Sequence, residues 1–139
     1  MRLINVNGRL VNKSVSQYII DWNKKSRSNI QFETKQFLKK YWLSHIMYEE
    51  FPVYGTLMKV DFLNATKKIA VEVQGSQHEK FNPFFHGNSR ANYLASIKRD
   101  YKKAKWLESN GFVLLEVYEK DINKLSEKYF EETFGISLL

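Results

Sequence analysis

The sequence predicts a layered α/β (α+β) domain in which helices flank a mixed central sheet that contains an antiparallel meander. Two observations lead to this fold class. Segments with helical periodicity alternate with strand-like segments in the order helix, strand, strand, strand, helix, strand, helix. The chain has 139 residues, of which 43% are hydrophobic and 15% aromatic. Such a chain is long enough for one domain with its own core and is unlike a disordered protein.

The first 28 residues are expected to form a hairpin and a short helix. Asn7-Gly8 stands between two short apolar runs, which is the strongest local signal for a tight hairpin turn. From Ser14 to Lys25 the apolar residues recur at helical spacing, which predicts a short amphipathic helix with a basic end. We therefore divide the chain into an N-terminal extension over 1–28 and a core over 29–139.

The core is expected to begin with a helix and three strands. Ser28 and Gln31 resemble a capping box, and the apolar residues that follow have helical period, so a helix is expected from about Asn29 to Ser44. Three strand-like runs come next and can pair as an antiparallel meander. They are HIMYEEFPV (45–53), LMKVDFL (57–63) and IAVEVQ (69–74).

The second half of the core is expected to be helix, strand and helix. A polar and aromatic loop leads to a long helix from about Arg90 to Ser109, which Asn110-Gly111 ends. The run FVLLEVY (112–118) predicts a buried strand, and KDINKLSEKYFEETF (120–134) predicts a final helix. We expect the last strand to lie beside the meander through a crossover connection.

Composition narrows the kind of site and the location. Cysteine is absent and there are three histidines, so disulfides and thiolate zinc sites are excluded, and oxygen is the expected ligand of any metal. No run approaches the roughly 20 apolar residues of a membrane span, and the first residues lack the apolar region of a signal peptide. We therefore expect a cytoplasmic protein with no membrane partner.

The charge balance points to a polyanionic partner. The chain has 22 Lys and Arg against 15 Asp and Glu, which gives a net charge of +7 and a pI of about 9.5. A basic protein attracts polyanions over a distance and releases their counterions when it binds. Nucleic acid is the first expectation.

Acidic residues stand on strand-like segments that should belong to the core. Because side chains alternate along a strand, Glu72 and Gln74 point to the same face. If the hairpin is centred between Thr66 and Lys67, Asp61 lies opposite Glu72, whereas a slip of one residue removes this pairing. In the first register two carboxylates meet, and they repel each other unless a cation lies between them.

A divalent cation would give this pairing a purpose. Carboxylates and waters suit Mg²⁺, with Mn²⁺ as a substitute, and the expected metal ligands are Asp61 and Glu72. Such an ion supports phosphodiester hydrolysis because it activates water and stabilises the leaving oxygen. The alternative is that both acids form the solvent side of half-buried strands, and their spacing alone does not decide between the two.

These residues and the order of the elements resemble the PD-(D/E)XK nuclease superfamily, in particular its very-short-patch-repair-like and phage-encoded, homing-type endonuclease branches. The resemblance covers about Asn29 to Val117 and implies a restriction-endonuclease-like core that binds Mg²⁺. Asp61 in KVDF and Glu72 in VEVQG stand where the family carries its two metal-binding acids. Gln74 replaces the usual lysine, a departure known in some members, which implies that the attacking water is positioned differently. A phage gene expressed in a bacterial host would fit this resemblance.

The resemblance also implies further site residues. Glu33 in QFETKQF matches a glutamate of the first core helix; from the residues alone it is equally a solvated acid of the first helical turn. His78 in GSQH matches a histidine that follows the third strand, where it would orient water or assist proton transfer. Its alternative is an exposed loop histidine. Asp100 resembles an acid on the next helix, and its alternative is an ion pair with Lys103.

The long helix of the second half carries a crowd of basic residues. Helical spacing puts Lys98, Lys102 and Lys105 on one side, which suits contact with phosphates across a groove. The alternative is a solvated basic face. The expected DNA-binding residues are Arg90, Lys98, Arg99, Lys102 and Lys105.

We therefore expect a Mg²⁺-dependent DNA endonuclease of homing, nicking or structure-specific type. Two alternatives are a catalytically inactive nucleic-acid-binding module on a nuclease-like fold, which the glutamine at position 74 favours, and an interaction or virion-assembly protein with a basic surface. The extension over 1–28 either contacts DNA through basic residues or builds a homodimer through aromatic ones, and the sequence does not decide. The expected catalytic residues are Asp61, Glu72, Gln74, Glu33, His78 and Asp100.

Overall fold

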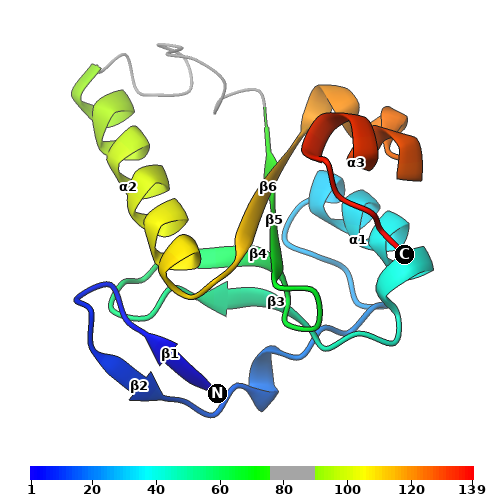
Figure 1. The fold of residues 1–139 in the computed structure, drawn as a ribbon. Coiled ribbons are helices and arrows are strands. Elements are labelled where there is room, and N and C mark those ends of the chain that lie inside the picture. Colours follow the sequence, from blue (N-terminus) through cyan, green and yellow to red (C-terminus); the bar gives the residue numbers. More distant parts are fainter. Residues whose placement is uncertain (76–89) are drawn as a thin grey trace.

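The computed structural model describes residues 1–75 and 90–139 and has a four-stranded sheet at its centre. In Figure 1, helix α2 lies on one side of this sheet, α1 and α3 lie on the other, and a separate two-stranded hairpin lies at one end. The strands are β1 (Arg2–Ile4), β2 (Leu10–Asn12), β3 (Met47–Pro52), β4 (Lys59–Asn64), β5 (Ile69–Gln74) and β6 (Val113–Tyr118). The helices are α1 (Asn29–Trp42), α2 (Arg90–Ser109) and α3 (Glu127–Phe134).

The central sheet has the mixed topology that the sequence predicts. Its order is β3-β4-β5-β6; β3, β4 and β5 pair antiparallel, and β6 pairs parallel to β5. The pairing of Phe62 with Val71 and of Asn64 with Ile69 fixes the register of β4 on β5. This is the first of the two registers considered above, and it brings Asp61 to the level of Glu72.

The first core helix is capped as expected but uses Gln31 differently. The Gln31 backbone N–H donates to Ser28 Oγ at 3.2 Å, which satisfies one of the amides at the start of α1. The Gln31 side chain is buried and donates to the carboxylates of Glu49 and Glu50 on β3 at 2.9 and 3.2 Å. The cap residue is therefore also a link between α1 and the sheet.

The expected helix over Ser14 to Lys25 is wrong. That segment holds a 3-10 turn at Ser16–Tyr18 and then runs extended along β3. The Ile20 N–H donates to the Met47 carbonyl at 3.0 Å, and Ile19 bridges to Tyr48. The apolar spacing was compatible with a helix, but two consecutive isoleucines favour extended backbone, and pairing with an edge strand satisfies its hydrogen bonds.

The expected single helix over 120–134 is divided into two. A 3-10 helix at Glu119–Lys124 ends at Leu125, which has extended backbone, and α3 begins after it. Ser126 Oγ accepts a hydrogen bond from the Tyr129 N–H at 3.0 Å. The serine side chain thus starts a new helix at a point where the apolar periodicity alone would continue the old one.

Apolar side chains fill both faces of the sheet. On one face Val71 and Val117 pack with Leu38 and Trp42 of α1 and with Phe130 of α3. The other face is covered at one end by the C-terminal part of α2, where Trp106 and Leu107 are buried against Phe51, Leu63 and Ala70. Toward the other end, β4 and β5 carry Asp61, Glu72 and Gln74 on this same face. Within the described ranges, no helix is both long and apolar enough to span a bilayer.

The N-terminal hairpin is fastened to the core at two points. The Asn110 side chain accepts from the Ile4 N–H at 2.8 Å and donates to the Ile4 carbonyl at 3.0 Å, which ties β1 to the end of α2. Near the hairpin turn, the Val6 N–H donates to the Tyr54 carbonyl at 3.0 Å. Gly55 makes this approach possible, because a Cβ at that position would lie 2.6 Å from Val6 Cγ2.

This close approach makes a testable difference between two glycines. Gly8 and Gly55 both have positive φ, so alanine at either position should cost about 1 kcal/mol in backbone strain. Gly55→Ala should cost roughly 1–3 kcal/mol more, because its Cβ also overlaps Val6, whereas the space around Gly8 is open. The measurement is the free energy of unfolding in urea. Val6→Ala should rescue Gly55→Ala in part, and equal destabilisation by the two glycine variants would contradict the contact.

Candidate functional site

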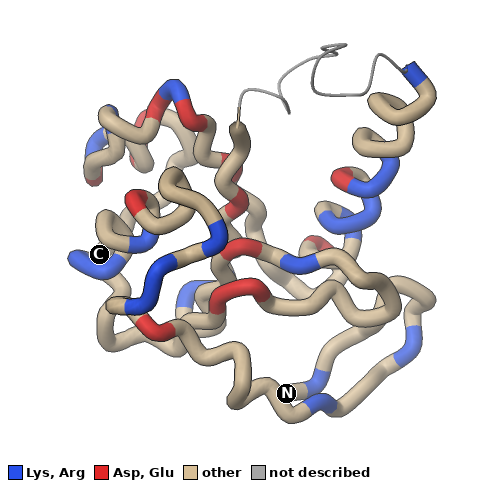
Figure 2. Tube along the Cα trace, turned by 180° about the vertical axis from the view of Figure 1, so that it is seen from behind, with Lys and Arg blue, Asp and Glu red and all other residues tan. Residues whose placement is uncertain are grey.

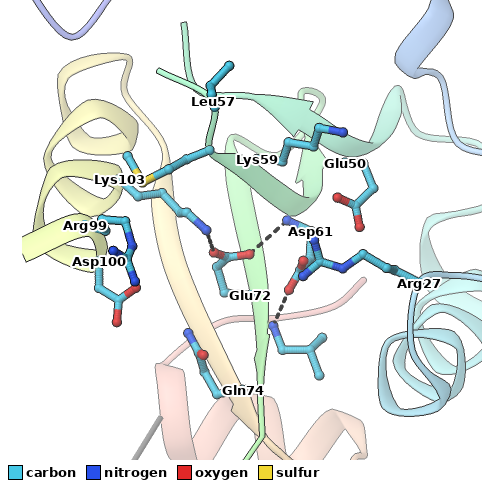
Figure 3. A pocket seen from close by; sticks show the side chains of 12 residues that line it. Arg27, Glu50, Leu57, Lys59, Asp61, Glu72, Gln74, Arg99, Asp100 and Lys103 are labelled. Carbon is cyan, nitrogen blue, oxygen red and sulfur yellow. Dashed lines mark hydrogen bonds and ion pairs between the residues drawn. The ribbon is translucent and has the colours of Figure 1, made fainter. Parts of the chain in front are cut away.

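A cleft of about 480 Å³ opens where α2 stands away from the ends of β4 and β5. Four of the residues predicted for the site line it: Asp61, Glu72, Gln74 and Asp100. Figure 3 shows these side chains with the basic residues that surround them, and Figure 2 shows acidic segments in the middle of the molecule flanked by basic ones. The cleft therefore has an acidic floor and basic walls.

The floor of the cleft is a pair of carboxylates, each of which accepts a hydrogen bond from a backbone N–H of the neighbouring strand. The Asp61 N–H donates to Glu72 Oε2 at 2.8 Å, and the Val73 N–H donates to Asp61 Oδ2 at 2.8 Å. These side-chain bonds stand where ladder bonds between β4 and β5 would otherwise continue. Asp61 and Glu72 are thus held together by the strands themselves, with little freedom to turn away from each other.

Burial makes this pair electrostatically unfavourable without a cation. Glu72 is 5% exposed. Burial, followed by the negative charge of Glu72, raises the pKa of Asp61 well above its ordinary range, while the hydrogen bond from Val73 and the charge of Lys103 oppose that rise. The site therefore binds a proton more readily than an ordinary aspartate would, and it should attract any cation that can reach it.

Lys103 is the cation that reaches it in this structure. Its Nζ, from the middle of α2, forms an ion pair with Glu72 Oε1 (Figure 3). From its spacing, Lys103 was considered as a partner for Asp100 and was not expected at the acids. Its position three residues after Asp100 indicated only that it shares a side of the helix with a predicted site residue.

Glu50 is a fourth acid that lines the cleft, after Asp61, Glu72 and Asp100. The pairs on either side of it, Glu49 with Phe62 and Phe51 with Val60, put Glu50 at the level of Asp61, and it lines the cleft. Its φ of 53° is in the left-handed region, which a residue other than glycine adopts at a cost in strain. The hydrogen bond from Gln31 holds its carboxylate. No sequence pattern marks such a backbone conformation in advance.

A buried ion pair fixes the opposite wall. Lys35 is 1% exposed, and its Nζ donates to Glu49 Oε1 and to the Lys24 carbonyl, both at 2.7 Å. Ser26 Oγ donates to the other oxygen of Glu49 at 2.6 Å. These bonds attach residues 24–26 to β3 and so place Arg27 at the cleft, where its side chain extends toward Asp61 (Figure 3).

Not every predicted residue joins the site. Glu33 lies on the exposed face of α1 and does not line the cleft, because Gln31 and Lys35, four residues apart, occupy the face that turns toward β3. His78 lies outside the described residues. Arg90 lies at the exposed start of α2, away from the residues that line the cleft.

The predicted DNA-binding residues on α2 divide between two surfaces. Arg99 lines the acidic cleft, whereas Lys98, Lys102 and Lys105 line a second groove beside the N-terminal hairpin. The three lysines share a side of the helix as expected. That side, however, adjoins the cleft and does not face into it.

Two carboxylates of the cleft are suitable ligands for a divalent cation. The part of the chain that the structure describes has no group of three or more His, Asp or Glu arranged to hold a metal. Mg²⁺ is nevertheless commonly held by one or two carboxylates together with waters and substrate phosphate. The paired acids Asp61 and Glu72 supply that donor set, and the raised pKa of Asp61 is the expected state of such a pair when no metal is bound.

The comparisons with known proteins do not assign a family. No family model and no solved structure matches the chain. Over 66 residues, 48% of this chain, it is 39% identical to the uncharacterized protein 033L of Invertebrate iridescent virus 3. The matched region spans 34% of that relative's length, so the chain corresponds to about a third of it.

The charge conflict at the floor predicts that Asp61→Asn stabilises the metal-free protein. Asparagine keeps an oxygen to accept from Val73 and loses the charge that repels Glu72. Because the pKa of Asp61 is higher in the folded state than in the unfolded state, folded wild type loses stability as the pH rises from about 4 through this raised value. The variant should therefore melt about 3 °C higher or more at about pH 8 and gain little at about pH 4.

Melting curves in EDTA at the two pH values would measure this difference. Glu116→Gln is a suitable control, because Glu116 pairs in register with Glu72 on the neighbouring strand but does not line the cleft. A variant that is less stable than wild type at about pH 8 would show that the carboxylates are not in conflict.

Proposed function

We propose that this chain is a metal-dependent endonuclease that hydrolyses phosphodiester bonds of DNA. The observation that carries the proposal is the pair of carboxylates, buried Glu72 and half-buried Asp61, on adjacent strands at the floor of a cleft with basic residues on its walls. Adjacent acids suit a divalent cation, and basic walls suit the phosphates of a polyanion. A net charge of +7 supports the same class of partner.

Six residues of the cleft have a role in this proposal. Asp61 and Glu72 hold Mg²⁺, or Mn²⁺ in its place, and the bound ion supplies charge stabilisation to the phosphate and lowers the pKa of a bound water. Arg27 and Arg99 bind the non-bridging phosphate oxygens from opposite walls. Gln74, on the same face of β5 as Glu72, accepts from or donates to the attacking water.

Lys103 compensates for the absence of a lysine at position 74. It reaches Glu72 from α2, so a cation stands at the acids although it comes from another element. In the proposed enzyme, Lys103 would exchange Glu72 for the substrate and donate to the phosphate or to the attacking water. The amine then supplies the positive charge that the glutamine side chain lacks.

The second candidate function is a nucleic-acid-binding module without catalysis. The ion pair between Lys103 and Glu72 favours it, because this contact neutralises the buried acid without any metal. In that case Gln74 and Lys103 would be structural residues, and DNA would bind the basic walls with no divalent cation required.

The proposal also includes a substrate, a place of action and the number of DNA strands that one cleft would cut. DNA is the substrate, and the cytoplasm of the host cell is the place of action; the matched viral relative is compatible with a gene carried by a virus. One cleft holds one pair of acids and would cut one strand. A break in both strands would then require a homodimer or two successive events.

The first test of the proposed function is cleavage itself. Purified protein with Mg²⁺ or Mn²⁺ should convert supercoiled plasmid, branched DNA or single-stranded DNA to nicked or shortened products, and EDTA should stop the reaction. Glu72→Gln should lower the rate at least about 100-fold, because it removes a metal ligand, while Glu116→Gln should cleave like wild type.

Calorimetry separates the two candidate functions. Heat of Mn²⁺ binding that disappears in Asp61→Asn supports the nuclease. Tight, salt-dependent DNA binding that needs no metal, together with no cleavage of any of the three substrates, would exclude the nuclease and favour the binding module.

The second prediction concerns Lys103. Lys103→Met should lower the cleavage rate at saturating DNA by about 100-fold or more, because the amine acts in the reaction and not merely in binding, and Lys103→Arg should recover part of that loss. Lys40→Met, at an exposed lysine of α1, should leave the rate unchanged. If Lys103→Met cleaves at the wild-type rate, the lysine serves to neutralise Glu72 and has no part in the reaction.

A further inference from the structure

A second groove, of about 380 Å³, lies between the N-terminal hairpin and α2. One wall is the hairpin, through Ile4, Asn5 and Val6, and the other is α2. The hydrogen bonds of Asn110 with Ile4 and of Val6 with Tyr54 hold the hairpin in place, so the groove is a fixed part of the fold. Its volume is within the range of pockets that bind small organic groups.

The α2 wall combines an exposed aromatic ring with a buried, unpaired donor. Tyr101 lines the groove and is 66% exposed, so much of its ring is open to solvent. Trp106 lines it too and is 2% exposed, and its Nε1 is the buried side-chain donor without a hydrogen-bond partner in the described part of the chain.

Three lysines border the same wall. Lys98, Lys102 and Lys105 line the groove, and none of them has an ion-pair partner among the described residues. At about 1.5 Å per residue they extend over roughly 10 Å of the helix. An anionic chain with more than one phosphate can therefore contact several of them at once.

The groove connects with the acidic cleft along the basic side of α2. Lys98 and Lys102 also line a third hollow, and there they meet Arg99, Leu57 and Met58, which in turn line the cleft. Leu57 is fully exposed at the junction. A strand whose phosphate lies over Asp61 and Glu72 can thus continue over the junction into the groove.

We infer that this groove binds an unpaired nucleotide of a DNA strand. The base stacks on the exposed ring of Tyr101, and the flanking phosphates bind Lys98, Lys102 and Lys105. A base in a duplex could not enter, because both of its faces are stacked and its edge is paired. The inference builds on the proposed function, since it gives that enzyme a preference for DNA with unpaired nucleotides near the cut.

The test uses binding and not cleavage, so it can fail while the nuclease proposal stands. Wild-type protein in EDTA is titrated into fluorescein-labelled oligonucleotides of one sequence, single-stranded or as a blunt duplex, and anisotropy is followed. The single strand should bind at least about tenfold more tightly, as expected when one base stacks on an aromatic ring.

Variants locate that preference in the groove. Tyr101→Ala should abolish it, lowering single-strand affinity by about tenfold, whereas Tyr101→Phe, which keeps the ring, should retain it. Leu94→Ala, at an exposed apolar residue of the same helix, is the matched control and should behave like wild type. Replacing Lys98, Lys102 and Lys105 together by Gln should reduce the slope of log affinity against log salt by about 2.

Three results would overturn the inference, and the first two leave the proposed function open. Equal affinity for the single strand and the duplex, or an unchanged preference in Tyr101→Ala, would show that the groove does not hold a base. If cleavage by wild type still required metal and Glu72, the proposed function would survive either result. Absence of DNA binding at low salt would overturn the inference and also remove DNA as the expected substrate.

Discussion

The close pairing of Asp61 with Glu72 is the constraint on which the rest of the site depends. The backbone N–H groups of Asp61 and Val73 hold the two carboxylates together, so neither can relieve the repulsion by rotating into solvent. Two like charges held close together on adjacent strands, one buried and one half-buried, cost stability, and a positive charge compensates for this cost. In this structure that charge comes from Lys103, and in the proposed enzyme it would come from a divalent ion.

The positions of the elements around the sheet are consistent with this requirement. Helix α2 must stand away from the ends of β4 and β5 to leave a cleft, yet it must pass close enough for Lys103 to reach Glu72. Its C-terminal end is anchored by Trp106 and Leu107 on the sheet, while its preceding turns are largely exposed. On the opposite wall, the ion pair of Lys35 with Glu49 fixes residues 24–26 on β3. It thereby helps to position Arg27 and Glu50 at the cleft. Removal of one member of such a pair leaves an uncompensated buried charge.

The sequence was informative where periodicity and turn chemistry are local. The strand order, β5 at 69–74 and α2 at 90–109 were predicted from alternation and turn residues. The pairing of Asp61 with Glu72 was one of two registers that the sequence allowed, and the structure has that one. Predictions from the sequence failed where tertiary contacts decide the local conformation. Ile19 and Ile20 extend along β3 although their spacing suits a helix. Glu33 is exposed because Gln31 and Lys35 occupy the inner face of α1. The positive φ of Glu50 has no signature in the local sequence. Lys103 was missed because position in a cleft depends on how far α2 leans from the sheet.

The hydrogen bonds between Ile4 and Asn110 join residues 106 positions apart in the chain, and this has a consequence for the order of folding. Contacts of such long sequence separation form late, because the intervening chain must first be closed into a loop. The acids, by contrast, lie on a local hairpin and are 11 positions apart in the chain. On a ribosome, the N-terminal hairpin emerges first but has no helix to dock on until α2 has been synthesised. The acidic floor of the cleft should therefore be in place before the groove beside it is closed.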